Sequence, residues 1–171
     1  MTSNKENMRL ALHVTSKDKI ESITRKGLEC KNYEDHPIAK DCSVFFYPLN
    51  GADKDIEFTP QNARLRNEDV DDSVYIIANI EDGIVGDLYD EGNTEKYLGN
   101  TMKYEEYLKE CRARSRFREP EVVVKGNVAK ERILGSLNYT KIKKIYEDCY
   151  DKNERFHRCD CIEKEIMKII K

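Results

Sequence analysis

LALHVTSKDKIESITRKGL, residues 10–28, decides the fold because it joins an apolar strand to a helix through a polar connection. Apolar and other residues alternate from Met8 to Val14, and this period of two is typical of a β-strand. His13 therefore projects from the face opposite Leu10 and Leu12. A rigid element thus presents a polar side chain away from the leucines.

The second half of the same stretch predicts a helix. Two isoleucines three residues apart indicate one apolar face, and we expect the helix to cover residues 17–26. Thr15 or Ser16 can cap its N-terminus, and Gly27 stands where a left-handed C-cap is expected.

Further strands and helices follow in no regular alternation. We predict strands over 43–49, 73–80, 84–88 and 120–126, and helices over 102–112 and 159–171. Asn50-Gly51 indicates a turn, and strand and helix patterns compete after Lys130. The predicted fold class is α+β, in one domain over residues 1–171 with a helical extension from about residue 140.

Composition restricts the class of protein. Charged residues make up 37% of the chain and the mean hydropathy is −0.79, which is typical of a globular protein with a charged surface. A net charge of −3 argues against a surface that coats nucleic acid. We expect no membrane span and no signal peptide, and therefore a cytoplasmic protein whose six cysteines are reduced thiols.

Three segments together resemble the ADP-ribosyltransferase-like superfamily of the His-Tyr-Glu type. The first is His-x-Thr-Ser, a helix and Lys-Gly-Leu, from His13 to Leu28. The second, SVFFYPLNGADKD at 43–55, is similar to the strand and turn that place an aromatic residue against nicotinamide. The third, REPEVVVKGNVAKERI at 118–133, is similar to the last core strand with its catalytic glutamate. Tyr47 or Phe46 matches the aromatic residue, and Glu121 matches the glutamate.

The resemblance implies two small packed β-sheets with flanking helices, and transfer of ADP-ribose from NAD to a macromolecular acceptor, protein or nucleic acid. Breaking the N-glycosidic bond passes through an oxocarbenium-like state, which a carboxylate such as Glu121 can stabilise while it orients the acceptor. His13 would bind the adenosine ribose and Tyr47 would stack on nicotinamide. Thr15 or Ser16 would hold the remaining polar groups.

An arginine-rich segment precedes the Glu121 strand. CRARSRFR, residues 111–118, has arginine at every second position, including Arg116. If extended, it forms a basic face for the NAD pyrophosphate or for a phosphate-bearing acceptor. Alternatively, neighbouring glutamates at 105, 106, 110 and 119 neutralise these charges.

Other interpretations stay open at this stage. The same fold includes RNA 2′-phosphotransferase-like enzymes and non-catalytic members, and an unrelated small α+β interaction protein would leave the three matches a coincidence. Cys149, His157, Cys159 and Cys161 offer soft ligands, but their spacing matches no usual zinc pattern. We therefore expect no metal site and interpret these cysteines as small buried thiols.

Overall fold

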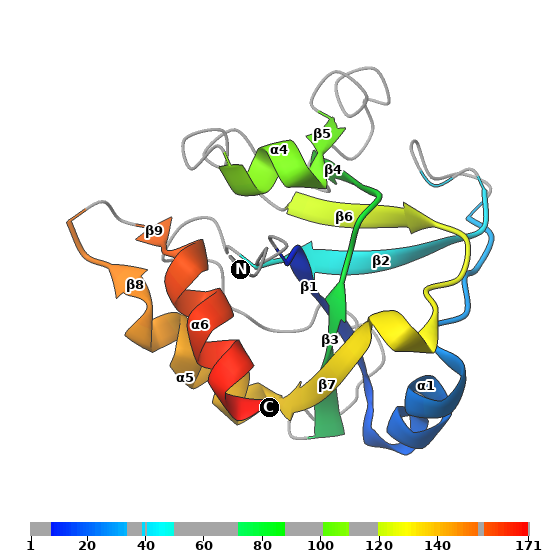
Figure 1. Ribbon diagram of the computed structural model, residues 1–171, viewed down its shortest axis with the longest axis horizontal. Coiled ribbons are helices and arrows are strands. Elements are labelled where there is room, and N and C mark those ends of the chain that lie inside the picture. The colour runs from blue at the N-terminus through cyan, green and yellow to red at the C-terminus, as the bar shows by residue number, and fades with distance from the viewer. Residues whose placement is uncertain are drawn as a thin grey trace, which may run out of the picture.

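The structure is a computed structural model that describes residues 8–33, 39, 41–49, 72–87, 101–109, 120–153 and 156–170 (Figure 1). Its helices, including the 3₁₀ turns η1 and η4, are η1 Lys17–Lys19, α1 Ile20–Lys26, α4 Tyr104–Lys109, η4 Lys130–Arg132, α5 Tyr139–Asp148 and α6 Cys159–Ile169. Its strands are β1 Leu10–Ser16, β2 Ser43–Pro48, β3 Ser73–Asn79, β4 Gly83–Asp87, β5 Met102–Lys103, β6 Pro120–Lys125, β7 Ile133–Asn138, β8 Tyr150–Asp151 and β9 Phe156–His157. The predicted α+β class is confirmed.

Seven strands form one antiparallel sheet in the order β5-β4-β6-β2-β1-β3-β7. Its two halves meet where β1 pairs with β2, at Ala11 with Pro48 and at Leu12 with Tyr47. Beyond this point β1 continues its pairing with β3, while β2 pairs with β6. The strands of the two halves run in clearly different directions in Figure 1. We call this junction the seam. Instead of the two packed sheets that the resemblance implies, these seven strands form one sheet with two halves joined at the seam, and β8 and β9 pair separately as a two-stranded sheet.

Both faces of the sheet carry apolar cores, because the residues of β1 alternate between them. Leu10 and Leu12 pack under α5 and α6 on one face, whereas Ala11 belongs to the core beneath α1 and α4. Figure 1 shows α5 and α6 together beside the β1–β3–β7 half. Among the described residues, no helix is long and apolar enough to cross a membrane.

The first helix is shorter than its pattern predicts. Residues 17–19 form a 3₁₀ turn, and α1 begins at Ile20, with no side-chain capping hydrogen bond from Ser16. Gly27 ends the helix with φ +88° and ψ −168°. The positive φ favours glycine, but the ψ differs from that of the left-handed helical C-cap that the sequence suggested. A Cβ at Gly27 would lie 2.2 Å from the Val128 carbonyl oxygen. Glycine therefore allows the chain after α1 to pair with Val128.

The other expected elements agree in place and differ in detail. Residues 102–103 form the edge strand β5 in place of a first helical turn. The ambiguous segment after Lys130 divides into β7 and α5, and Asn138 caps α5 by accepting a hydrogen bond from the Lys141 backbone at 2.9 Å. The Asn50-Gly51 turn and the arginine-rich segment with Arg116 lie outside the described residues.

The expectation of reduced cysteines is wrong for four of them. Disulfides join Cys30 to Cys42 and Cys149 to Cys161, with Cα–Cα distances of 5.1 and 5.6 Å. The expectation relied on compartment, but bond formation depends on how the fold places each pair. The second disulfide also engages two of the four residues considered for zinc. No group of potential metal ligands occurs in the described part of the chain.

Candidate functional site

A pocket of about 740 Å³ lies at the seam. Its walls come from β1, β2 and the start of β6, and from α1 with the chain that follows it to Tyr33. Its volume falls within the range of roughly 300–1,000 Å³ that is usual for small-molecule sites. The lining residues His13, Val14 and Thr15 lie just beyond Leu12, the last residue of β1 that pairs with β2.

His13 lies in the pocket on β1 and is half-buried. Its Nδ1 lies 2.8 Å from the carbonyl oxygen of Phe45 on β2. A carbonyl can only accept, so Nδ1 carries a proton and donates it to Phe45. The ring also meets the edge of Phe46, at 5.7 Å between centroids. These two contacts fix the orientation of the imidazole across the seam.

Tyr47 and Glu121 line the same pocket from neighbouring strands. The register pairs Phe46 with Val122, so one further step along β2 and β6 brings Tyr47 opposite Glu121. Residues paired in this way project on the same face of the sheet. Glu121 is half-buried at the beginning of β6, where it also pairs with Gly86 of β4. His13, Tyr47 and Glu121 thus line one pocket from three adjacent strands, β1, β2 and β6.

The other expected binding residues divide into three groups. Thr15 and Phe46 line the pocket. Ser16 is not among the lining residues, because it lies where β1 passes into the 3₁₀ turn. Arg116 lies outside the described residues.

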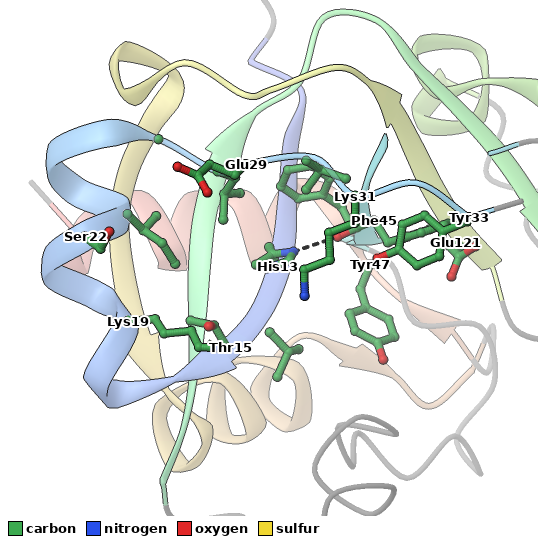
Figure 2. A pocket seen from close by; sticks show the side chains of 16 residues that line it. His13, Thr15, Lys19, Ser22, Glu29, Lys31, Tyr33, Phe45, Tyr47 and Glu121 are labelled. Atoms are coloured by element: carbon green, nitrogen blue, oxygen red, sulfur yellow. Dashed lines mark hydrogen bonds between the residues drawn. The ribbon is translucent and has the colours of Figure 1, made fainter. Parts of the chain in front are cut away.

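Six further polar or aromatic side chains line the pocket and were missed in the sequence, namely Lys19, Ser22, Glu29, Lys31, Tyr33 and Phe45. Tyr33 packs edge-on against Phe45, with 4.5 Å between ring centroids. Figure 2 shows Tyr33, Tyr47 and Glu121 at one end of the view and Lys19 and Ser22 at the other. Residues 29–33 have no periodic pattern, so the sequence suggested only an exposed connection. Helix position alone could have suggested Lys19 and Ser22.

The charges of the pocket are mixed. Lys19 and Lys31 form no ion pair within the described chain, and the same holds for Glu29. By contrast, Lys125 outside the pocket pairs with Asp41 at 2.9 Å, and its hydrogen bond holds the pKa of that carboxyl below the usual value. Unpaired cations, hydroxyl groups and aromatic rings together suit an anionic ligand that carries flat rings.

No protein-family model matches the sequence, and no curated protein matches it. The pocket residues therefore carry the functional argument.

Proposed function

We propose that the protein binds NAD at the seam and transfers ADP-ribose from it to a macromolecular acceptor, within an ADP-ribosyltransferase-like fold. The observation that carries the proposal is the meeting of His13, Tyr47 and Glu121 in one pocket. These residues belong to segments far apart in the chain. The sequence motifs point to each of the three independently, so their convergence in one pocket supports the proposal.

The shape of the pocket also supports a dinucleotide. His13 lies between the end with Tyr47 and Glu121 and the end with Lys19 and Ser22 (Figure 2). An extended ligand can place its nicotinamide at the first end and its adenosine toward the second. In this orientation His13 is in the central part of the pocket, where its oriented ring can hydrogen-bond a ribose hydroxyl.

Each residue has a chemical role in the proposed reaction. The Tyr47 ring stacks against nicotinamide and holds the glycosidic bond near Glu121. As the bond from nicotinamide nitrogen to the ribose carbon breaks, positive charge grows on the ribose, and the Glu121 carboxylate stabilises it. The same carboxylate accepts the proton of the acceptor nucleophile, which forms the new bond to that carbon. Nicotinamide leaves with the electron pair of the broken bond.

The test combines NAD binding with nicotinamide release, using Glu121→Gln, which removes charge and keeps shape. We expect the wild-type protein to bind NAD and release nicotinamide in the presence of protein and nucleic-acid acceptors. The variant should release nicotinamide at least about 100-fold more slowly, the usual effect of removing one charge-stabilising group. Its affinity for NAD should stay within a few-fold of wild type.

Glu29→Gln is the matched control, because it removes another carboxylate from the same pocket. Figure 2 shows Glu29 well apart from Glu121. We expect this control to retain the rate of nicotinamide release. A wild-type protein that fails to bind NAD would refute the proposal. Binding without release under every acceptor tested would leave a non-catalytic pocket, and equal rates for the two variants would remove Glu121 from its role.

A further inference from the structure

Lys31 occupies a central place in the pocket that the roles above leave unused. Figure 2 shows its side chain extending across the pocket toward His13. Within the described residues its ammonium group forms no ion pair. A ligand therefore does not have to displace a carboxylate from Lys31. In the NAD orientation proposed above, nicotinamide and adenosine occupy opposite ends of the pocket. The Lys31 ammonium group, in the centre, then faces the two phosphates that join them.

The chain on either side of Lys31 is fastened to the sheet by backbone hydrogen bonds. The Lys31 N–H donates to the Ser43 carbonyl at 3.0 Å, and the Ser43 N–H donates to the Lys31 carbonyl at 2.9 Å. Three residues earlier, Leu28 and Val128 exchange two bonds of 2.9 Å each. The segment 28–31 thus crosses from the turn after β6 to the start of β2.

A disulfide lies in the middle of this segment. Cys30 immediately precedes Lys31, and its partner Cys42 immediately precedes Ser43. The Cys30 N–H also donates to Asn127 Oδ1 at 2.8 Å, and the Cys42 carbonyl accepts from the Gly126 N–H at 2.7 Å. The disulfide therefore lies next to the backbone hydrogen bonds between Lys31 and Ser43. Together they limit the movement of Lys31 relative to β2.

We propose that Lys31 binds the diphosphate of the dinucleotide and that the Cys30–Cys42 disulfide positions it, so that reduction of this disulfide weakens binding. This inference rests on the proposed NAD site. A charged donor held in place binds phosphate oxygens better than a mobile one, because less side-chain and backbone freedom is lost on binding.

The two disulfides differ in accessibility. Cys30 and Cys42 are both partly exposed, whereas in the second disulfide Cys149 is 2% exposed and only its partner Cys161 is partly exposed. A dithiol reductant attacks one sulfur of Cys30–Cys42, and each cysteine sulfur gains one electron and one proton as the reductant becomes a cyclic disulfide. Under native conditions both cysteines of Cys30–Cys42 are open to the reductant, whereas Cys149–Cys161 can be approached only from the Cys161 side.

The first experiment tests the charge of Lys31 by calorimetric titration with NAD, ADP and adenosine. Lys31→Gln should weaken NAD and ADP binding by about 10- to 100-fold, as expected for losing a charged hydrogen bond, and should flatten the salt dependence. Adenosine lacks phosphate, so its affinity should not change. Lys31→Arg should retain most of the affinity because it keeps the charge.

Lys144→Gln is the matched control for the first experiment. Lys144 lies on α5, pairs with Asp148 at 3.3 Å and is not a pocket residue. Its substitution should leave all three affinities unchanged. Equal NAD affinity of Lys31→Gln and the wild type would overturn the inference while the proposed function stands. No NAD binding by the wild type would instead end the proposed function.

The second experiment tests the disulfide with dithiothreitol and the double variant Cys30→Ser/Cys42→Ser. Reduction should lower the NAD affinity of the wild type, and the double variant should show this lower affinity with and without reductant. In Lys31→Gln, reduction should cause no further loss, because the disulfide acts through Lys31. If reduction disturbed folding in general, it would also lower the NAD affinity of Lys31→Gln, and that result would refute the positioning role. An unchanged NAD affinity of the wild type after verified reduction would refute it too.

Discussion

Gly27→Ala should destabilise the protein far more than Gly126→Ala, although both glycines have positive φ. Gly27 has φ +88° and Gly126 has φ +75°. A Cβ at Gly27 would lie 2.2 Å from the Val128 carbonyl oxygen and 2.9 Å from the Lys130 nitrogen. No atom of the described residues lies within 4 Å of a Cβ at Gly126. The pair therefore separates the cost of backbone conformation from the cost of overlap.

The magnitude follows from these two contributions. A side chain in a positive-φ conformation costs about 1–2 kcal/mol, which is the whole cost expected at Gly126. At Gly27 the conformation costs about 1–3 kcal/mol. Relief of the overlap must also displace Val128 and disturb its paired bonds with Leu28, for a further cost of about 1–3 kcal/mol. We expect Gly27→Ala to lose about 2 kcal/mol more than Gly126→Ala.

Urea denaturation of the two variants measures this difference in the free energy of unfolding. Gly27 and Leu28 also line the pocket, so Gly27→Ala should weaken NAD binding even where the protein remains folded. Gly126 is not a lining residue, and its variant should bind as the wild type does. Losses of stability within about 0.5 kcal/mol of each other would show that the chain after α1 relaxes freely, contrary to the reasoning above.

Two further predictions concern buried tyrosines. Tyr104→Phe should cost about 1–3 kcal/mol in urea denaturation, because the buried hydroxyl donates to the Leu10 carbonyl and accepts from the Leu49 N–H; a loss below about 0.5 kcal/mol would contradict this. Burial raises the pKa of Tyr75 and of Tyr146 above the ordinary value of 10.0, so their contribution to stability is complete below pH 10.0 and declines as the pH rises above it. Tyr75→Phe should reduce this decline in urea denaturations at rising pH, and an unchanged decline would count against burial as its cause.

Local patterns were enough to predict β1 and the segments that contain His13, Tyr47 and Glu121. Residues of β1 alternate between the two faces of the sheet, and Leu10 and Leu12 pack into the core under α5 and α6. His13 must therefore project from the opposite face. The run of valines after Glu121 indicates a buried strand, and β6 begins at Pro120 as this pattern suggests. Such predictions succeed because they need only neighbours in the chain.

Features that depend on distant parts of the chain were not predicted. The Cys30–Cys42 bond requires the chain after α1 to return to the start of β2, which no local pattern encodes. Lys31 and Tyr33 enter the pocket for the same reason. The beginning of α1 was predicted too early because charged residues at 17–19 suit a helix and a 3₁₀ turn equally well.

The position of His13 explains why the pocket and the seam coincide. Where β1 and β2 stop pairing, the Phe45 carbonyl on β2 needs a donor, and the imidazole Nδ1–H supplies it. An aliphatic side chain at residue 13 would leave this carbonyl to water and could not orient a ligand. Histidine donates a hydrogen bond to the strand through Nδ1, and this bond sets the orientation of Nε2. The same hydrogen bond that completes β2 thus prepares the site, so His13 contributes to the fold and to the proposed binding at once.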